Sequence, residues 1–302
     1  MKILLFFFIS LIFTACENKS DSSNSLIPLY SDDKPLLESI YIFGVHPLHN
    51  PKLLFDVYQP MIDLINDNLK GAKLRLEASR SYATFNEKLF SGYFDFALPN
   101  PYQTVEASKK GYSIFGKMGD DENFKGIILV RKDSKIKNVS DLKNKSISYP
   151  APTALAATML PQWFLQKNGI DINNDIKNIY VGSQESSIMS VYLGKTIAAS
   201  TWPPPWESFK LNRPEIAKFL EIKWETKSLP NNGLVVKKTI NKELLNKISN
   251  IIFNLHTHEK GRKILEGMHL SKYEKADDTT YNVVREFLKN FEKEIRPLRK
   301  SE

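Results

Sequence analysis

Short apolar segments alternate with longer amphipathic segments along most of this 302-residue chain. Between residues 54 and 69 the apolar side chains recur at a helical spacing, at Leu54, Val57, Tyr58, Met61, Ile62 and Ile65. Shorter apolar runs bounded by turn residues are typical of buried strands. The first part of the chain therefore predicts strands at 39–45, 74–78 and 94–98, which alternate with helices at 54–69, 82–90 and 101–110.

The alternation restarts after residue 125. Strands are predicted at 126–130, 146–149, 178–181 and 196–200, with a short capped turn at 140–142 and helices at 153–167 and 183–193. Pro161 lies inside the first of these helices and is expected to kink it or to restrict its first part to about two turns. This order of strands and helices predicts a second α/β unit with a mainly parallel sheet and helices on both faces.

The last third of the chain is mostly helical. A strand at 234–236 follows the turn at 230–233, and helices are predicted at 242–256, 260–268 and 279–291. The simplest arrangement packs these helices on the first unit, so that the chain crosses between the units twice, near 124–132 and near 224–234. We therefore predict an α/β fold with two lobes. Lobe 1 comprises residues 36–124 and 230–302, and lobe 2 comprises residues 125–229.

The N-terminus has the order of a bacterial secretory signal. Lys2 precedes a largely apolar stretch at residues 3–13, and Thr14-Ala15 precedes Cys16, the only cysteine. The stretch is about half the length that a membrane-spanning helix needs. These features predict a signal peptide at 1–15, lipid attachment to the Cys16 sulfur, and a flexible tether over the rest of 16–35, which is rich in serine. The alternative is an ordinary signal peptide with an incidental cysteine.

Composition and charge exclude several classes of protein. Hydrophobic content of 42% supports a folded core, and no later apolar run is long enough for a transmembrane helix. With Cys16 committed to lipid, no disulfide can form within the chain. The formal net charge is +8, but the lysines are scattered and form no basic stripe with interleaved aromatic residues. Nucleic-acid binding is therefore not expected.

Polar and aromatic residues stand at five predicted junctions between a strand and a helix. In open α/β sheets, ligands bind at the carboxyl ends of strands, beside the free amides of helix N-termini. The residues at these junctions are His46 and His49; Ser81 and Tyr82; Tyr102; Thr153; and Ser183 and Gln184. Each has a structural explanation on its own, since the serines can cap helices, Tyr102 can pack and the histidines can occupy a turn. Their recurrence at one topological position predicts a shared cleft.

The segment Trp202-Pro203-Pro204-Pro205-Trp206 follows the last strand of the second unit. Three prolines predict an extended, rigid backbone without N–H donors. Its tryptophans have two alternative roles: they form a stacking wall beside the cleft, or they fill core.

The sequence holds no recognised catalytic constellation. It has no Gly-x-Ser-x-Gly elbow and no His-Glu-x-x-His motif, and no third residue follows His46 and His49 at a metal-ligand spacing. We therefore expect a binding protein without cofactor or metal, and not an enzyme.

The chain resembles the substrate-binding proteins of phosphate, phosphite and phosphonate ABC importers over about residues 40–291. In the first lobe the segments that carry the resemblance are Phe43-Gly44-Val45, Asn50-Pro51, Tyr58-Gln59-Pro60, Ser81-Tyr82, Phe94-Asp95-Phe96-Ala97, and Pro101-Tyr102. Further along they are Val130-Arg131-Lys132-Asp133-Ser134, Asp141-Leu142-Lys143, Leu160-Pro161, Lys167-Asn168-Gly169-Ile170-Asp171, and Gly182-Ser183. The resemblance implies a type II periplasmic-binding-protein fold, with a two-segment hinge that closes around a small ligand.

Three departures from the family pattern bear on the ligand. Consecutive serine and threonine hydroxyls of phosphonate-binding members are replaced by Ala154-Leu155-Ala156, although backbone N–H groups there can still bind an oxyanion. Gln184 stands where a histidine often follows the Gly-Ser pair, and Ile197 stands where an acidic residue is expected. The ligand is therefore expected to carry an oxyanion, with room for a larger or less polar molecule than the family's usual one.

These observations predict a lipid-anchored, extracytoplasmic, monomeric protein that delivers a small molecule to an ABC permease. The predicted ligand contacts are Tyr82, Tyr102, Thr153, Ser81, Gln184, Trp202 and His46. Two alternatives remain open at this point. In one, the same fold presents its closed form to a membrane receptor such as a histidine kinase. In the other, which is less favoured, the two lobes carry an enzyme.

Overall fold

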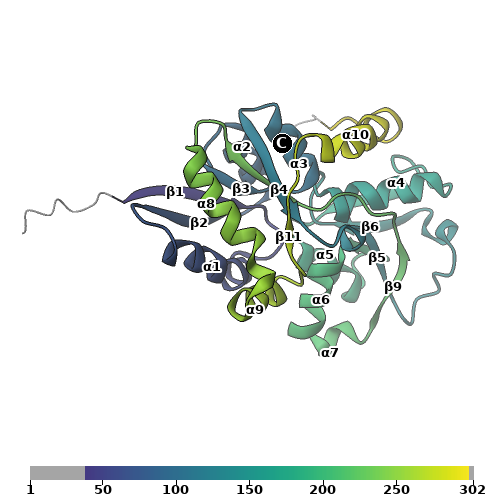
Figure 1. Ribbon diagram of the computed structural model, residues 1–302. Helices are drawn as coiled ribbons and strands as arrows, with labels where there is room; N and C mark the ends of the chain where they lie inside the picture. The colour runs from purple at the N-terminus through teal and green to yellow at the C-terminus, as the bar shows by residue number, and fades with distance from the viewer. Residues whose placement is uncertain (1–37, 299–302) are drawn as a thin grey trace, which may run out of the picture. The chain divides into compact units, whose positions relative to one another are not determined.

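The computed structural model describes residues 38–298 (Figure 1). The predicted signal peptide, Cys16 and the tether at 16–35 lie outside the described residues. Within the described part of the chain, no helix combines the length and apolar character that crossing a membrane requires.

The first sheet has six strands in the order β11-β4-β10-β3-β1-β2. Their bounds are β1 Ser39–Val45, β2 Ala72–Ala78, β3 Phe96–Leu98, β4 Tyr112–Met118, β10 Gly233–Lys237 and β11 Tyr273–Glu274. β1 pairs in parallel with β2 and β3, whereas β10 pairs antiparallel with both β3 and β4. The strands come from two distant parts of the chain, so the first lobe is built discontinuously.

Helices cover both faces of the first sheet (Figure 1). On one face, α1 (Pro51–Asp67) contacts both α8 (Lys242–Phe253) and α9 (Glu259–Gly267). α2 (Tyr82–Phe90) and α3 (Pro101–Ser108) pack on the other. Phe43 and Val45 join the first core and Ile42 joins the second, because successive side chains of a strand point to opposite faces.

The second sheet has five strands in the order β7-β6-β8-β5-β9. Their bounds are β5 Ile127–Arg131, β6 Lys145–Tyr149, β7 Ile176–Tyr180, β8 Ala198–Thr201 and β9 Leu220–Glu225. The helices are α4 Leu160–Lys167, α5 Gln184–Tyr192, α6 Pro203–Asn212 and α7 Pro214–Ala217. This strand membership supports lobe boundaries at 36–124 with 230–302 and at 125–229, which we retain as a proposal.

Both sheets are mixed, whereas the sequence predicts mainly parallel ones. β6, β7 and β8 run parallel, but β5 is antiparallel to both β8 and β9. The antiparallel pairs arise because the chain leaves and re-enters each lobe: β4 and β5 flank the outgoing crossing, and β9 and β10 flank the return. Parallel pairing holds between β1, β2 and β3 and between β6, β7 and β8, and the loops after β1, β3, β6 and β8 position the site.

Two crossing segments, residues 119–126 and 226–232, form the two-segment hinge, and they are bonded to each other. The carboxylate of Asp121 accepts from the backbone N–H of Asn231 at 2.9 Å and from Lys117 Nζ at 2.8 Å. The side-chain amide of Asn231 in turn donates to the carbonyl of Gly119 at 2.7 Å. Tyr281 donates its hydroxyl to the carbonyl of Asn231 at 2.6 Å, so Asn231 joins both crossings to the C-terminal part of the chain.

Two predicted elements take a different form. The helix predicted at 153–167 begins as a π-helical segment, Leu155–Met159, and becomes α-helical only at Leu160. Pro161 lacks the N–H that an α-helix needs at that position, which explains the change of pitch. The predicted extended segment at 202–206 is instead the start of α6, because its three prolines occupy the first helical turn, where N–H groups have no intrahelical partner.

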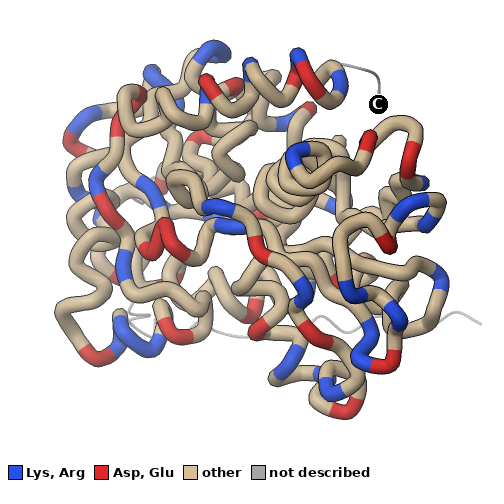
Figure 2. The backbone as a smooth tube through the Cα atoms, turned by 90° about the vertical axis from the view of Figure 1, so that its right-hand side faces the viewer, with Lys and Arg blue, Asp and Glu red and all other residues tan. Residues whose placement is uncertain are grey.

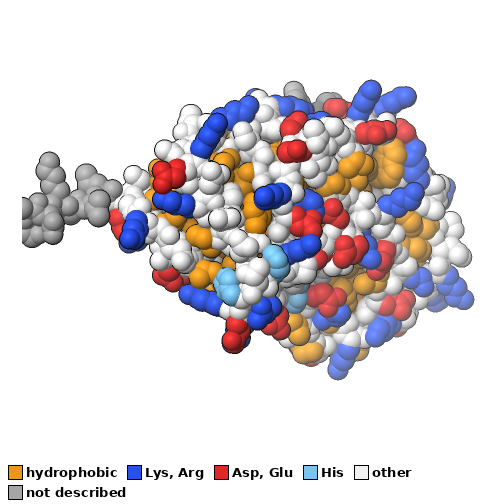
Figure 3. Space-filling view, in the orientation of Figure 1, with side chains coloured by type: hydrophobic (Ala, Val, Ile, Leu, Met, Phe, Trp, Pro, Cys, Tyr) orange, Lys and Arg blue, Asp and Glu red, His pale blue; other side chains and the backbone are white. Residues whose placement is uncertain are grey.

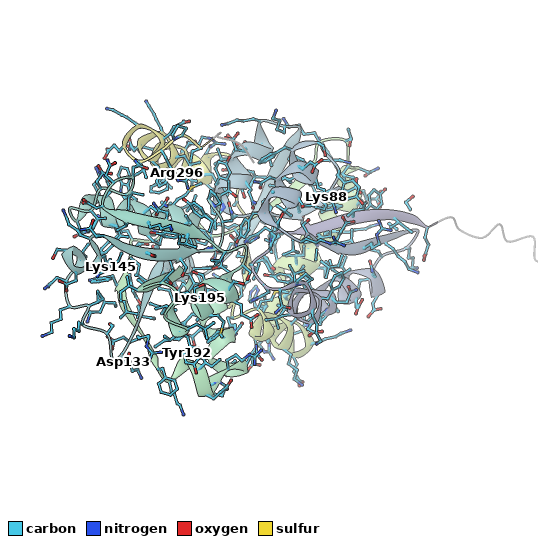
Figure 4. All side chains as sticks on the ribbon, turned by 180° about the vertical axis from the view of Figure 1, so that it is seen from behind. Lys88, Asp133, Lys145, Tyr192, Lys195 and Arg296 are labelled. Carbon is cyan, nitrogen blue, oxygen red and sulfur yellow. The ribbon has the colours of Figure 1, made fainter. Side chains whose placement is uncertain are left out.

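The C-terminal helix α10 (Asn282–Glu294) contacts α3 of the first lobe and extends to the second lobe. Just beyond it, Arg296 donates to the carbonyl of Pro152 at 2.6 Å and to the side-chain oxygen of Gln162 at 3.2 Å. Figure 4 shows Arg296 at the end of this helix, on the side of the second sheet. The C-terminal segment is therefore a third, non-covalent connection between the lobes.

Candidate ligand-binding site

A small cavity lies between the two sheets. It has about 10 Å³ of space for the centre of a water-sized molecule and is lined by His46, Tyr82, Asn100, Phe124, Ala154, Leu155, Ala156, Ala157, Gln184, Trp202 and Asn232. Its volume is below the range of about 300–1,000 Å³ that is usual for small-molecule sites. In this closed arrangement the cavity has room for about one water molecule, so the lobes must move apart to admit a ligand.

The cavity residues come from the ends of strands in both lobes and from both crossing segments. His46 follows β1 and Asn100 follows β3, whereas Ala154 and Trp202 follow β6 and β8. Phe124 and Asn232 belong to the two crossings, and the ring of Phe124 contacts that of Trp202 with centroids 5.5 Å apart. When the hinge closes, both lobes and both crossing segments therefore contribute residues around a ligand.

Three backbone amides of the π-helical segment are available to a ligand. The N–H groups of Leu155, Ala156 and Ala157 make no hydrogen bond within the described part of the chain, because the first bonds of the segment begin at Thr158 and Met159, which donate to the carbonyl of Ala154. Free amides at the start of a helix attract negative charge. Since the side chains here are short or apolar, the main chain supplies the polar surface of this wall.

Hydrogen bonds connect the lobes around the cavity. Gln184 Nε2 donates to the hydroxyl of Tyr82 at 3.2 Å, and Asn100 Nδ2 donates to the carbonyl of Thr153 at 2.9 Å. Asn100 is held for this contact by a capping box at the start of α3, in which Gln103 is its partner. These bonds hold the two lobes together in the closed arrangement.

His46 is a buried, neutral imidazole at the cavity wall. Its Nδ1 lies 2.9 Å from the carbonyl oxygen of Leu98, which can only accept, so Nδ1 carries the proton. Burial lowers the pKa of His46 to about 4, and the bond to Leu98 opposes this change only in part. The ring lies edge-on to the rings of Tyr82 and Phe85, with centroids 6.2 and 6.3 Å away. Nε2 is therefore left as a hydrogen-bond acceptor.

Tyr82 is a protonated hydroxyl under all ordinary conditions. Burial raises its pKa above the usual range of a phenol, and the hydrogen bond from Gln184 opposes this only partly. Because the Tyr82 oxygen accepts from Gln184, its own proton remains available to a ligand. Gln184 is oriented in turn by Thr201, which donates to Gln184 Oε1 at 2.8 Å.

No ionised side chain lines the cavity. Lysine, arginine and acidic residues are instead distributed along both lobes (Figure 2), and the face seen in Figure 3 shows both signs interspersed. Among residues 38–298, no cluster of histidine, cysteine or acidic residues could hold a metal ion. Charge complementarity for a ligand therefore comes from amides and helix termini alone.

The structure brings four of the predicted contacts, His46, Tyr82, Gln184 and Trp202, to the cavity. The other three lie outside its lining. Ser81 caps α2 by accepting from the N–H of Thr84 at 3.1 Å. Thr153 is buried nearby and offers its carbonyl to Asn100, and Tyr102 lies in a separate pocket beside α10, because the first turn of α3 directs it away.

Asn100, Asn232 and Phe124 line the cavity although they are absent from the predicted contacts. Asn100 lies between the strand predicted at 94–98 and the helix predicted at 101–110, and that position was the available signal. Asn232 lies in a Pro-Asn-Asn-Gly turn, where asparagine has a structural explanation that conceals any other role. Phe124 belongs to a crossing segment, whose place beside the cleft depends on the tertiary fold.

Comparison with known proteins identifies the family. A family model described as "ABC transporter, phosphonate, periplasmic substrate-binding protein" matches residues 43–281. The chain belongs to this family. It is 21% identical over 265 residues to the phosphonates-binding periplasmic protein of Escherichia coli (strain K12), covering 85% of this chain and 77% of that protein.

Two solved structures show the same fold. One is a protein from Prochlorococcus marinus in complex with methylphosphonate, with a TM-score of 0.77 and 18% identity over 85% of this chain and 99% of the other. The second is a binding protein component of an ABC phosphonate transporter from Pseudomonas aeruginosa, with a TM-score of 0.75 and 19% identity over 83% of this chain and 85% of the other.

Membership of the family confirms the broad predictions. The fold is that of a type II periplasmic binding protein, and the chain is a solute-binding protein of an ABC transporter and not an enzyme. The family also implies a location outside the cytoplasm and an ABC permease as partner.

Proposed function

We propose that this protein captures a small phosphonate or phosphite between its lobes and delivers it to an ABC permease. The observation that carries the proposal is the wall of free amides at Leu155, Ala156 and Ala157, which faces Tyr82 across a cavity of small volume. The names of the relatives support the ligand class, since both the Escherichia coli protein and the methylphosphonate complex concern phosphonates.

Closure supplies the mechanism of capture. A ligand held by the amides of lobe 2 and the Tyr82 hydroxyl of lobe 1 makes both sets of contacts only when the lobes meet. It therefore shifts the open–closed equilibrium by its difference in affinity for the two forms. The direct bonds Gln184–Tyr82 and Asn100–Thr153 join the two lobes and so lower the cost of closing.

A thermal-shift series with methylphosphonate, phosphite, phosphate and a larger phosphonate tests the proposal. At 100 times its Kd, a bound ligand adds about 2.7 kcal/mol of stability. For a chain of this size we expect the melting temperature to rise by roughly 4–5 °C. If all four compounds leave the melting temperature unchanged, the proposed ligand class is wrong.

A pair of variants at one position tests the amide wall. Leu155 is the first residue of its helix, and Ala154 before it is extended, so proline at 155 fits the backbone and removes one N–H donor. Leu155→Ala removes the same side chain but keeps the N–H, which makes it the matched control. We expect Leu155→Pro to bind methylphosphonate about tenfold or more weakly than Leu155→Ala. Equal affinities would contradict a role for this amide.

We also propose that Cys16 carries the lipid that anchors the protein to the membrane. The order of a short apolar stretch, small residues and a single cysteine supports this. When the expressed protein is partitioned between a detergent phase and water, the wild type is expected in the detergent phase and Cys16→Ser in the aqueous phase. An ordinary signal peptide would leave both in the aqueous phase, with the same cleaved mass.

We expect the mature protein to act as a monomer, as the sequence predicts. Light scattering during size-exclusion chromatography, with and without methylphosphonate, measures the mass directly. A mass of about twice the chain, at micromolar concentration, would contradict this.

A further inference from the structure

The cavity offers hydrogen-bond acceptors as well as donors. His46 lines it with Nδ1 committed to Leu98, which leaves Nε2 as an acceptor. Asn232 lines it too, and its side-chain oxygen is fully buried without a hydrogen-bond partner among the described residues. A fully buried acceptor without a donor, such as this Asn232 oxygen, costs about 1–3 kcal/mol. A ligand that brings an O–H group would supply a donor to this pair of acceptors.

The absence of ionised side chains from the cavity lining also favours a ligand that carries an O–H group. A doubly charged oxyanion would enter this cavity with only amides and hydroxyls to balance it. The desolvation of a second charge without a cationic partner is expensive. A singly charged, protonated oxyanion avoids this cost and also carries the missing donor.

We propose that the cavity selects oxyanions in their protonated, singly charged form, with the single ligand O–H shared between His46 Nε2 and Asn232 Oδ1. The anionic oxygens then face the amides of Leu155, Ala156 and Ala157 and the hydroxyl of Tyr82. This inference rests on the proposed function and extends it to specificity. Sulfonates of the same shape have no such O–H near neutral pH, so the site rejects them.

The groups that face His46 do not titrate in the relevant range. Tyr82 from α2 stays protonated, and Phe85 from the same helix carries no charge. His49 on the following loop has its pKa lowered to about 3 by burial, with His269 and His46 as smaller causes. The pKa of His46 itself is about 4. Above about pH 5.5 neither His46 nor His49 gains a proton, so neither of these imidazoles causes a change in affinity.

Calorimetric titration with methylphosphonate and methanesulfonate between about pH 5.5 and 8.5 tests the inference. Phosphate esters lose their second proton near pH 6, and a phosphonate does so near neutral pH. Above the pH at which methylphosphonate loses its second proton, we expect its Kd to rise about tenfold for each pH unit. Methanesulfonate is expected to bind about a hundredfold or more weakly than methylphosphonate at pH 6.

Two outcomes would overturn the inference while the proposed function stands: affinity for methylphosphonate that increases with pH, or methanesulfonate that binds as tightly as methylphosphonate. If neither compound binds at any pH, the proposed function itself fails. Among variants, His46→Leu is expected to reduce the preference for methylphosphonate over methanesulfonate. His256→Asn, at an exposed histidine far along the chain, leaves that preference unchanged. The wild-type titrations decide the question even if His46→Leu does not fold.

Discussion

The side-chain amide of Gln184, at the start of α5, donates a hydrogen bond to the hydroxyl of Tyr82, at the start of α2, over 3.2 Å. These two residues belong to different lobes and are 102 positions apart in the chain. The bond exists only when the lobes are closed. It joins Gln184, which lines the cavity from lobe 2, to Tyr82, which we expect to contact the ligand.

Replacing Tyr82 by phenylalanine should weaken ligand binding more than it weakens the fold. The variant loses the acceptor for Gln184 and the donor to the ligand while it keeps the ring. We expect the Kd of methylphosphonate to rise about tenfold or more, corresponding to about 1.5 kcal/mol. Tyr93→Phe removes a hydroxyl that bonds to Glu77 on the surface and serves as the control. Similar Kd values for the two variants would exclude the role given to Tyr82.

The buried histidine predicts how stability depends on pH. The pKa of His46 is lowered from about 6.5 to about 4, mainly by burial. The unfolded state therefore binds a proton first as the pH falls, so stability is fully present above about pH 6.5 and is lost progressively down to about pH 4. The two pKa values correspond to roughly 3 kcal/mol.

Urea unfolding at several pH values between 7 and 4 measures this dependence. His46→Asn should show a flatter decline than the wild type, and His256→Asn should follow the wild type. Part of the decline persists in His46→Asn, because the pKa of His49 is lowered as well. A variant curve parallel to that of the wild type would show that His46 does not cause the decline.

Gly126 allows the first crossing segment to lie close against the cavity wall. A Cβ at this position would lie 2.6 Å from the carbonyl oxygen of Ala156 and 2.5 Å from Pro161. Gly126→Ala should cost about 1–3 kcal/mol of stability and, because it displaces the amides of the π-helical segment, weaken ligand binding. Gly267→Ala, where a Cβ meets nothing within 4 Å, is the matched control. Denaturant unfolding and calorimetry on both variants check this, and unchanged binding in Gly126→Ala would refute it.

Arg296 positions the loop that leads into the cavity wall. Its guanidinium bonds to the carbonyl of Pro152 and to Gln162, so Arg296→Gln should cost about 1–3 kcal/mol of stability. We expect a several-fold increase in Kd, because the loop and the amides that follow it lose this support. Arg262→Gln, at an exposed arginine of α9, should change neither quantity. Loss of stability with an unchanged Kd would limit Arg296 to a structural role.

The sequence predicts elements best where local signals mark both ends. The bounds of β1 at 39–45 and of α2 at 82–90 are confirmed to the residue, and in α2 the Ser81 cap and the turn at Gly92 explain the agreement. β4 and β9 were not predicted, because their half-buried residues alternate too weakly to stand out. The extended segment predicted at 202–206 was wrong, because prolines favour the first turn of a helix as well as an extended chain.

The sequence predicts the location of the site better than it predicts the residues that line it. Strand ends bring His46, Tyr82, Gln184 and Trp202 to one cavity, as the topological rule for α/β sheets implies. Tyr102 follows the same rule and lies elsewhere, since the rule locates a residue along the chain but not the direction of its side chain. Asn232 depends on the return crossing, whose position only the folded chain fixes.

The backbone amides at 155–157 allow the side chains of this segment to change during evolution. Any residue except proline carries the same peptide N–H, so the short side chains found here can be exchanged over generations without loss of the anchor for a negative oxygen. A larger or more polar residue would redraw the space around the rest of the ligand. Single substitutions in this segment can therefore change which ligand the protein accepts, while each variant keeps the amides that bind a negative oxygen.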